Sequence, residues 1–458
     1  MGRSSEINKS VLLLDSFNAE GKTLYESFIN AGYKGPVLVI EEDGFLPDGV
    51  ISIYQYFCGE YITNDNIPGK PRYFNQIDIP DYWSISGDGG MAYVRDMSKE
   101  RGRIFYNGQR HKRLVKVVDW KDEKDNVRCC EHYNGKGALY AKTYFNKKNE
   151  KFCKIYFDAN GKEVIYENYG TKDIMLSIDG KDYIFNNKVE FIIKVIEDLN
   201  AKNATIFFNT LSTPFFVSNM MNKDRKGDVL FWQEGPRNDI PGNMKTIFNG
   251  QSNQVKKIYV QNKDSYNKLI ELGADKNIVE LLGNVYTFLR SNNHSNKILI
   301  CTNSDNIEKC EQLIQSLPDM EFNIVALTEM SSKLLSLGKY RNVNLYPNAK
   351  NVLIDELFNT CDYYFDINHE TEIVDAVRQA FINNLLILGF HNTLHNKKYI
   401  HPDHVFKNDA DLVEFSKKIV DNNTEMDKSI QVQHEHAMSE NVEKYIRLLN
   451  KWEEERWY

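Results

Sequence analysis

The sequence predicts an α/β protein with two doubly wound Rossmann-like domains, the first of them interrupted by an antiparallel β-meander. Short apolar strands alternate with amphipathic helices near both ends of the chain, and aromatic-rich segments joined by Asn-Gly and Asp-Gly turns lie between them. The length of 458 residues allows about three domains. We expect an N-terminal Rossmann-like domain over 1–80 and 187–290, a β-meander over 81–186, a C-terminal Rossmann-like domain over 295–425, and a final helix within 430–458 that packs back across the domains.

The first strand–helix alternation starts near the N-terminus. Val11 to Asp15 is a predicted strand, Leu24 to Ala31 a predicted amphipathic helix, and Val37 to Ile40 the next strand. The same alternation returns after the β-meander. There we expect helices at 189–199 and 263–272 and strands at 205–209, 229–233 and 258–261.

The middle of the chain, from about Tyr82 to Phe185, follows a different pattern. Short β-type runs recur about every 8–12 residues and are separated by turn sequences such as Asn134-Gly135 and Asp179-Gly180, which predicts an antiparallel meander. Its aromatic residues are expected to pack within the sheet rather than form a ligand platform. The predicted strands include 114–118, 138–145, 152–157, 163–169 and 174–178.

A second strand–helix alternation follows a polar linker at 290–296. Two doubly wound domains with a cleft between them are the arrangement of GT-B glycosyltransferases, and ligands bind such sheets at the carboxyl ends of the strands. A last amphipathic helix is predicted at about 439–457. The second alternation consists of strands at 298–302, 322–327, 343–346, 362–367 and 385–389 and helices at 307–317, 330–337, 352–359 and 371–382.

Composition excludes several classes of protein. The 57 Lys and Arg against 64 Asp and Glu give a net charge of −7, which argues against a nucleic-acid binder. No run approaches the roughly 20 apolar residues of a membrane-spanning helix, and the apolar run near the N-terminus is too short for a signal peptide. The seven cysteines lack C-x-x-C spacing and indicate reduced thiols. We therefore expect a cytoplasmic protein without a disulfide framework.

Two motifs with catalytic or metal-binding spacing favour simpler interpretations. Ser16 to Thr23 ends in Gly-Lys-Thr like a phosphate-binding loop, but Ser16 replaces the first glycine and Glu20 adds a carboxylate, so an ordinary helix start is favoured over a GTPase or ATPase. Four histidines have the spacing of metal ligands, but they lie in a polar loop with no helix to fix that spacing, and we expect no metal site. They are His391, His395, His401 and His404.

A basic cluster lies at the entry to the β-meander. A solvated rim is the simplest interpretation, while docking to an acidic partner or to anionic lipid at a membrane surface stays open. The cluster consists of Lys99, Arg101, Arg103, Arg110, Lys112, Arg113 and Lys116.

The region 366–388 resembles the donor-binding step of retaining GT-B enzymes of the family-4 type, which carries a Glu-x7-Glu motif. Laid on that motif, Glu370 takes the first Glu position and Arg378 the second. A guanidinium cannot accept hydrogen bonds from ribose hydroxyls. Asn383 and Leu385 stand where glycine and proline are usual in that family. The nucleotide contact is therefore expected to be lost.

The pyrophosphate contacts of the same enzymes also have poor counterparts here. An Arg and a Lys five residues later usually neutralise the leaving group, and such donors contribute about 10²–10³-fold each to rate. Asn303 and Glu308 replace them, although a shift of one residue offers Lys309. The chain resembles a glycosyltransferase scaffold without donor chemistry, and we predict no catalytic, cofactor or metal residues.

Several longer strings closely resemble the GtfB family, the glycosyltransferase-stabilising subunits of the accessory Sec system. The resemblance runs from about residue 11 to 400. The strings are residues 41–47, 71–76, 211–218, 231–234, 241–244, 326–332, 366–369 and 392–396.

This resemblance implies a non-catalytic partner of a related GT-B enzyme, GtfA, which transfers N-acetylglucosamine from UDP-GlcNAc to Ser and Thr of serine-rich repeat adhesins before export. The stabilising subunit keeps that enzyme soluble and helps to recognise the acceptor. Their β modules are expected to meet in a heterotetramer at the cytoplasmic face of the membrane. The alternative is an active retaining GT-B glycosyltransferase that uses UDP-GlcNAc with Glu370.

We expect the former donor cleft to hold the acceptor instead. A tryptophan among amide and carboxylate groups suits a sugar or a hydroxyl-rich peptide, with an apolar face on the ring and hydrogen bonds at its rim. The candidate lining residues are Ser212, Thr213, Trp232, Gln233, Glu234, Asn303, Glu329, Glu370 and Arg378.

Overall fold

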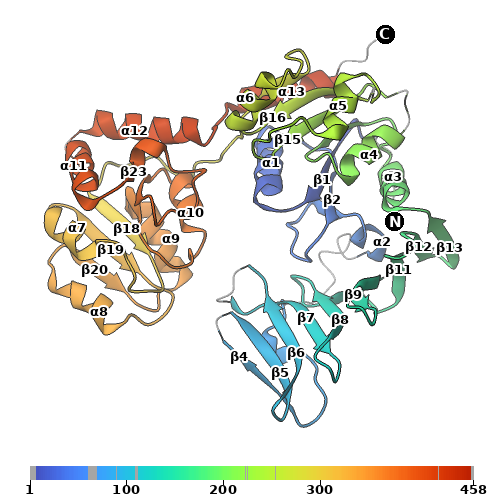
Figure 1. The fold of residues 1–458 in the computed structure, drawn as a ribbon, viewed down its shortest axis with the longest axis horizontal. Helices are drawn as coiled ribbons and strands as arrows, with labels where there is room; N and C mark the ends of the chain where they lie inside the picture. The colour runs from blue at the N-terminus through green and yellow to red at the C-terminus, as the bar shows by residue number, and fades with distance from the viewer. Residues whose placement is uncertain are drawn as a thin grey trace. The chain divides into compact units, whose positions relative to one another are not determined.

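The computed structural model confirms the predicted fold class (Figure 1). It describes residues 7–59, 70–88, 90–108, 112–221, 223, 225–252, 254–420 and 422–454. The chain divides into two compact units, Met1–Leu282 with Val442–Tyr458, and Gly283–Asn441. The first unit holds a Rossmann-like sheet and the β-meander, and the second holds another Rossmann-like sheet. The finer domain boundaries within the first unit stay a prediction.

The Rossmann-like sheet of the first unit is entirely parallel, in the order β17-β16-β15-β14-β1-β2-β3. Parallel sheets have helices on both faces, which explains why their strands are continuous apolar runs. The strands are β1 (Ser10–Ser16), β2 (Val37–Glu41), β3 (Val50–Ser52), β14 (Thr205–Phe208), β15 (Asp228–Trp232), β16 (Val255–Val260) and β17 (Val279–Leu281), and the helices are α1 (Ala19–Asn30), α2 (Gln55–Cys58), α3 (Lys188–Asp198), α4 (Thr213–Met220), α5 (Gly242–Phe248), α6 (Lys263–Glu271) and α13 (Val442–Glu454).

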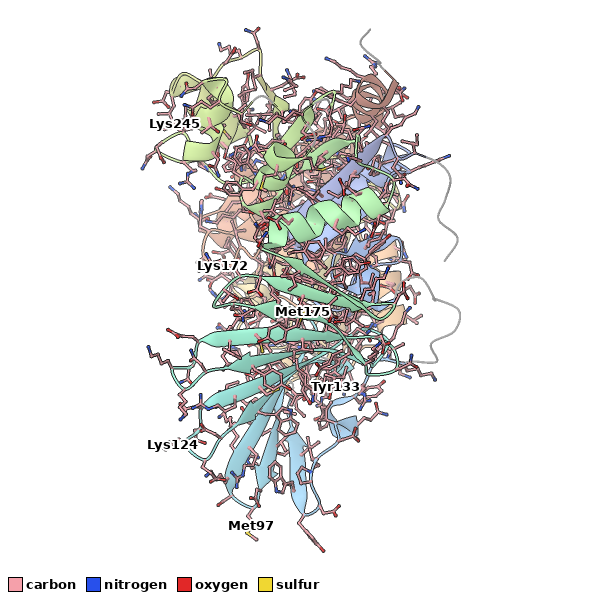
Figure 2. All side chains as sticks on the ribbon, turned by 90° about the vertical axis from the view of Figure 1, so that its right-hand side faces the viewer. Met97, Lys124, Tyr133, Lys172, Met175 and Lys245 are labelled. Atoms are coloured by element: carbon pink, nitrogen blue, oxygen red, sulfur yellow. The ribbon has the colours of Figure 1, made fainter. Side chains whose placement is uncertain are left out.

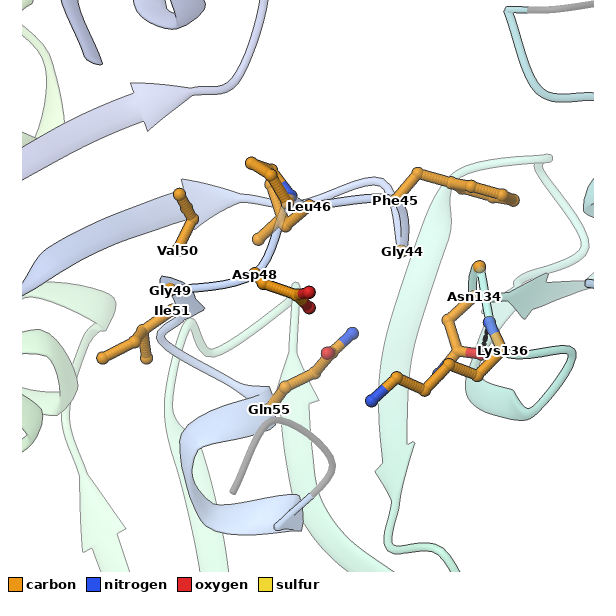
Figure 3. A pocket seen from close by; sticks show the side chains of 12 residues that line it. Gly44, Phe45, Leu46, Asp48, Gly49, Val50, Ile51, Gln55, Asn134 and Lys136 are labelled. Atoms are coloured by element: carbon orange, nitrogen blue, oxygen red, sulfur yellow. Dashed lines mark hydrogen bonds between the residues drawn. The ribbon is translucent and has the colours of Figure 1, made fainter. Parts of the chain in front are cut away.

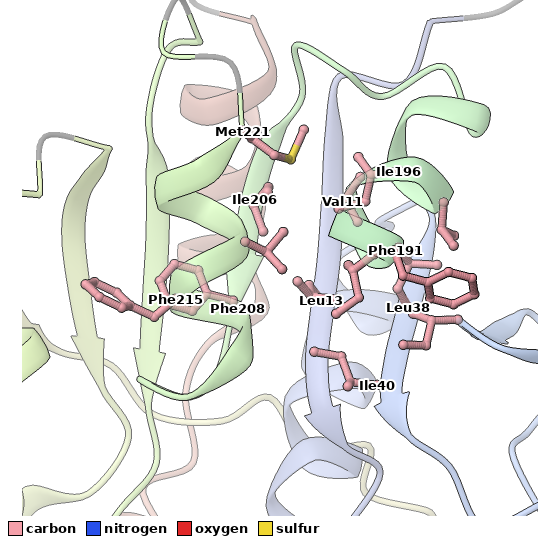
Figure 4. Close-up of a cluster of buried hydrophobic side chains, with 14 of the residues drawn as sticks. Val11, Leu13, Leu38, Ile40, Phe191, Ile196, Ile206, Phe208, Phe215 and Met221 are labelled. Carbon is pink, nitrogen blue, oxygen red and sulfur yellow. The ribbon is translucent and has the colours of Figure 1, made fainter. Parts of the chain in front are cut away.

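The main core of this unit lies between the sheet and the helices α3 and α4 (Figure 4). Strand residues such as Leu13 and Leu38 meet Phe191 of α3 and Phe215 of α4 there. The helix α3 buries one face because its apolar residues recur at helical spacing. The helices thus fix the sheet, and the carboxyl ends of its strands, in a rigid frame.

The β-meander forms a single antiparallel sheet of ten strands in which each strand pairs with its sequence neighbours, from β4 to β13. The strands β10 to β12 contribute Tyr156, Ile165 and Leu176 to the main core of the unit. The other end of the sheet has its own core, which includes Val94 and Ile104. The strands are β4 (Trp83–Gly87), β5 (Met91–Asp96), β6 (Lys99–Tyr106), β7 (Val115–Lys121), β8 (Val127–Tyr133), β9 (Leu139–Phe145), β10 (Lys151–Phe157), β11 (Glu163–Asn168), β12 (Ile174–Ile178) and β13 (Lys181–Phe185).

The second unit has six parallel strands in the order β20-β19-β18-β21-β22-β23. In both units the first strand lies beside the fourth of the parallel series, which places a topological switch point between β1 and β14 and another between β18 and β21. The elements are β18 (Lys297–Cys301), β19 (Glu321–Val325), β20 (Val343–Tyr346), β21 (Tyr363–Asp366), β22 (Leu386–Phe390), β23 (Val405–Phe406), α7 (Cys310–Ser316), α8 (Ser332–Leu335), α9 (Asn351–Thr360), α10 (Ala376–Ile382), α11 (Asp409–Val420) and α12 (Asn423–His436).

The C-terminal helix α13 packs on the first unit, although it follows the second in sequence. Tyr445 is fully buried, with ring centroids 6.0 Å from Phe28 and 6.4 Å from Phe231, and its hydroxyl lies 2.9 Å from Gln261 Nε2. The polar stretch before it, for which no helix was predicted, contains α11 and α12. The pattern was missed because polar residues make up most of α12, and few apolar residues, including Met426 and Ile430, are buried.

A buried ion pair ties β15 to the rest of the first unit. Arg225 donates to both carboxylate oxygens of Asp228, at 2.6 and 2.8 Å, and both side chains are fully buried. Ser218 Oγ and the backbone N–H of Ile206 also donate to Asp228, at 2.5 and 2.8 Å. The carboxylate therefore joins three segments of the chain.

Asp228→Ala is expected to lower the free energy of unfolding by about 3–5 kcal/mol, because it leaves the Arg225 guanidinium buried without its carboxylate. Chemical denaturation measures this change. Arg237→Ala is the matched control, because Arg237 and Glu234 form an exposed pair at the same spacing and its loss should cost less than about 1 kcal/mol. Equal losses of unfolding free energy in the two variants would contradict the assignment of Arg225 and Asp228 as a stabilising buried ion pair.

Candidate functional site

The carboxyl ends of β18 and β21 carry two loops that we call the β18 loop (residues 302–309) and the β21 loop (residues 367–375). The backbone N–H of Glu308 donates to Ile367 O at 2.8 Å, and that of His369 donates to Asn306 O at 3.0 Å. These bonds form a short antiparallel bridge between the loops. The two loops are therefore joined across the switch point of the second unit.

Side chains reinforce this pairing of the loops. His369 Nε2 lies 2.6 Å from Glu308 Oε2, and Thr302 Oγ1 donates to Asn368 Oδ1 at 3.1 Å. Asn303 Oδ1 accepts from the backbone N–H of Leu327 at 2.8 Å. Asn303 and Glu308, which the sequence predicts to stand in place of the cations of GT-B enzymes, are thus held in internal hydrogen bonds. A carboxylate at this point would repel a pyrophosphate.

The helix after the β18 loop starts later than predicted. The sequence predicted a helix from Ile307, but α7 begins at Cys310, and Lys309 adopts the left-handed conformation with φ of 52°. The loop pairing explains the difference, because residues 306–308 use backbone groups in the bridge to the β21 loop. Doubly wound folds place ligand phosphates against a helix N-terminus next to the first strand, and this chain puts extended backbone there.

Glu370 lies on the β21 loop with an exposed side chain. Its backbone oxygen is 2.6 Å from His395 Nε2, and its Oε1 is 3.4 Å from Asn306 Nδ2. His395 Nδ1 is 2.5 Å from Oδ1 of Asp366, whose side chain is buried. This hydrogen bond to the Asp366 carboxylate raises the pKa of His395 to about 9. A charged histidine therefore holds the loop that carries Glu370.

The helix α10 also begins later than predicted, at Ala376 instead of Thr371. Val374 and Asp375 both have positive φ, so the chain turns sharply just before the helix. Arg378 consequently lies in the first turn of α10, and Glu372 Oε1 accepts from the backbone N–H of Val377 at 2.7 Å. Burial raises the pKa of Glu372. Sequence reasoning missed this carboxylate because the Glu-x7-Glu spacing directed attention to Glu370 and Arg378.

The first unit has a polar cluster at its own switch point. Ser212 Oγ donates to Asp15 Oδ1 at 2.7 Å and lies 2.7 Å from Thr210 Oγ1, and the backbone N–H of Asp15 donates to Asn209 Oδ1 at 2.9 Å. Of these residues the sequence predicted Ser212 alone. Asp15 and Asn209 were missed, although both lie at the carboxyl ends of their predicted strands, the edge at which ligands bind such sheets.

Gln233 extends this polar cluster along the sheet edge. Its Nε2 donates to Glu20 O and to Gln261 Oε1, each at 2.9 Å, and its Oε1 accepts from Asn209 Nδ2 at 3.1 Å. Glu234 is exposed and pairs with Arg237 at 3.3 Å. Most polar atoms here are thus already engaged in hydrogen bonds that hold them in place.

Trp232 corrects one expectation about the lining residues. The side chain is only 2% exposed and belongs to the main core of the first unit. The side chain is buried because β15 is a central strand whose side chains pack under helices. It is therefore not placed to stack on a ligand. Thr213 begins α4 and is half-buried. In the second unit Glu329 is exposed, after β19.

The Gly-Lys-Thr sequence after β1 is the first turn of α1, as the favoured interpretation predicted. Asn18 caps the helix by accepting from the backbone N–H of Gly21 at 2.8 Å, and Thr23 Oγ1 donates to Ala19 O at 2.8 Å. Lys22 forms an i,i+4 pair with Glu26 at 3.9 Å. The loop is closed by its own cap rather than shaped to hold a phosphate.

The basic cluster of the β-meander is largely neutralised by carboxylates. Lys99 and Arg101 both pair with Glu123, and Arg103 pairs with Glu100 at 2.6 Å. Arg110 lies outside the described residues. These ion pairs favour a solvated rim over a docking site for acidic partners or lipid.

Neither a metal centre nor a membrane span is found in the part of the chain that the structure describes. It contains no group of three or more His, Cys, Asp or Glu side chains that could hold a metal ion. None of its helices combines the length and apolar character needed to cross a lipid bilayer.

The two sheets and their switch points define the class of protein: a GT-B fold, as glycosyltransferases have. The pneumococcal O-GlcNAc transferase GtfA in complex with UDP and GlcNAc shares the fold, with a TM-score of 0.51 at 12% identity over 98% of this chain and 100% of that chain. A chain in the crystal structure of the GtfA/B complex bound to UDP and GlcNAc is much more similar. Its TM-score is 0.90 at 40% identity, over 96% of this chain and 99% of that chain.

The chain belongs to the GtfB family. The GtfB N-terminal, middle and third domain models match residues 11–57, 83–186 and 188–272, and the GftB/GlyA-F C-terminal domain model matches 298–433. The UDP-N-acetylglucosamine--peptide N-acetylglucosaminyltransferase stabilizing protein GtfB of Streptococcus pneumoniae serotype 4 is 43% identical over 93% of this chain and 95% of that protein.

The pair of His395 and Asp366 predicts a pH dependence of stability. Because the pKa of His395 is raised from 6.5 to about 9 in the folded chain, its contribution is complete below pH 6.5 and is lost as the pH rises towards 9. The difference in unfolding free energy between wild type and His395→Gln should therefore shrink over this range, as measured by urea denaturation. His391→Gln, at an exposed histidine of the same loop, is the control. A difference in unfolding free energy that does not change with pH would contradict the raised pKa of His395.

Proposed function

We propose that this chain is the non-catalytic subunit of a protein O-GlcNAc transferase and stabilises a GtfA-like catalytic partner. The pairing of the β18 and β21 loops carries this proposal. Glu308 and Asn303 stand in place of phosphate-binding cations and are held by hydrogen bonds to His369 and to the backbone of Leu327. Donor chemistry with UDP-GlcNAc is therefore assigned to the partner, in agreement with the name of the family's stabilising proteins.

The proposal includes an acceptor. The chain would bind the serine-rich repeat adhesin whose Ser and Thr residues the partner glycosylates before export by the accessory Sec system. The complex would work in the cytoplasm, in peripheral contact with the membrane. The polar groups at the carboxyl ends of β1 and β14 support acceptor binding, because the Asp15 carboxylate and the Ser212 hydroxyl can each accept a further hydrogen bond from a hydroxyl.

A second candidate function is that of an active retaining glycosyltransferase. The observation in its favour is Glu370, which is exposed at the position of the first motif carboxylate and lies on a loop fixed by His395. If this function holds, Glu370→Gln abolishes transfer of N-acetylglucosamine, and the chain turns over without a partner.

Calorimetric titration of the isolated chain with UDP and with UDP-GlcNAc, with and without magnesium, separates the two functions. We expect no binding at millimolar ligand, because the β18 loop uses backbone groups of Asn306 and Glu308 in the loop pairing and the Glu308 carboxylate opposes the pyrophosphate charge. The GtfA-like partner is the positive control. Micromolar binding to the isolated chain would contradict the non-catalytic assignment and favour the function of an active retaining glycosyltransferase.

The partner is proposed to contact the β-meander, giving a heterotetramer through the β modules. Residues directly opposite one another in the register share a face, and one such row contains Ile155, Tyr166, Met175 and Ile184 on β10 to β13. Met175 is 38% and Ile184 70% exposed. Met175 is labelled on the sheet in Figure 2. An apolar row that runs to an edge strand suits a second sheet, because a partner covers apolar area there and can pair with the edge.

Ile184→Asp is expected to weaken association with the catalytic partner about tenfold or more, because it places a charge in a buried apolar contact. Co-purification and analytical ultracentrifugation of the co-expressed subunits measure this effect. Lys181→Asp is the matched control, because Lys181 lies on the same strand but faces the opposite side of the sheet. Unchanged assembly of the Ile184 variant would exclude this row from the interface.

A further inference from the structure

A cavity of about 550 Å³ lies in the first unit (Figure 3). Its walls are the segment between β2 and β3, the strand β3, the first residue of α2, and the turn between β8 and β9. The volume falls within the range of about 300–1,000 Å³ that is common for ligand sites. The cavity thus lies where the β-meander meets the Rossmann-like sheet.

The two walls are joined at one end. The backbone N–H of Gly135 donates to Gly44 O at 2.8 Å. Gly44 has φ of 81°, and a Cβ there would lie 2.8 Å from a ring carbon of Tyr140 and 2.9 Å from Tyr133 O. The close approach therefore requires glycine at this position. This contact fixes the relative position of the walls, so the cavity is preformed.

Three polar side chains point into the same space from different walls. Figure 3 shows the carboxylate of Asp48, the amide of Gln55 and the ammonium group of Lys136 directed towards its centre, while Leu46, Val50 and Ile51 line one side. The Nε2 atom of Gln55 is buried and has no hydrogen-bond partner among the described residues. A buried donor without a partner is costly, and a ligand with an acceptor group would satisfy it.

These groups define the chemistry of the ligand. Asp48 only accepts hydrogen bonds, Lys136 only donates them, and Gln55 does both, which matches the alternating C=O and N–H groups of a peptide. A phosphate-bearing ligand is disfavoured by the Asp48 carboxylate. Gly49 leaves room for a backbone to approach the wall closely, because nothing lies within 4 Å of the position that a Cβ would take there. The site suits an extended chain with small side chains.

We propose that this cavity binds a segment of the unmodified, Ser/Thr-rich acceptor polypeptide. The inference rests on the proposed function, and it places an acceptor contact at the junction of the two sheets of the first unit rather than at a former donor position. The serine and threonine hydroxyls reach Asp48 and Gln55, the peptide carbonyls accept from Lys136 and Gln55, and the threonine methyl groups contact the apolar side.

Fluorescence anisotropy of a labelled, unglycosylated Ser/Thr/Ala-rich peptide, titrated with the full chain, tests the proposal. Gln55→Ala and Lys136→Glu are each expected to raise the Kd about tenfold or more, because each removes hydrogen bonds to the peptide. Lys148→Glu is the matched control. It makes the same charge change at an exposed position in the next turn of the sheet, between β9 and β10.

The outcomes separate this inference from the proposed function. If the wild-type chain binds the peptide and Lys136→Glu and Gln55→Ala bind it equally well, the cavity is not the site, although acceptor binding stands. If the wild-type chain does not bind the peptide, alone or with its catalytic partner, acceptor binding itself is wrong. Each variant should keep the thermal unfolding temperature of the wild type and its association with the partner, which shows that it is folded.

Discussion

The pairing of the β18 and β21 loops is the constraint on which the proposed function of this chain depends. In a doubly wound sheet the two loops at the switch point usually part to leave a crevice, and a helix N-terminus then faces the ligand phosphates. Here Asn306, Glu308, Ile367 and His369 join the loops through their backbones, and α7 starts late. This loop pairing supports the proposed non-catalytic role, and relatives of the chain are named as stabilising proteins.

The first unit presents polar groups in fixed positions at the ends of its strands. They are fixed because Asp15, Asn209, Ser212 and Gln233 hold one another by hydrogen bonds. Such satisfied polar networks are rigid, since breaking any one bond leaves a partner without its match. The preformed cavity beside β3 adds a second set of polar groups on the same rigid unit. An acceptor polypeptide is long, and several fixed contacts along one unit suit it better than one deep pocket.

The β-meander combines two packing arrangements in one continuous sheet. Near β5 to β7, residues such as Ile104 and Val118 are buried in a small core of their own. Towards β13, register places Met175 and Ile184 on that same face, where they are exposed, while the opposite face packs on the Rossmann-like domain. Sheet twist makes this change of covered face possible. It leaves an apolar row for which a partner sheet is the proposed cover.

The sequence by itself determined the fold class, the interruption by the β-meander and the family, because these depend on local periodicity, turn residues and long matching strings. It also predicts that Asn303, Glu308 and Arg378 stand in place of donor-binding groups. Tertiary structure decided which polar residues act together. It buried Trp232, paired Glu308 with His369, and brought Asp48, Gln55 and Lys136 to one cavity. The physical reason is that contacts between residues distant in sequence depend on strand order and on loop paths, and no local pattern encodes those.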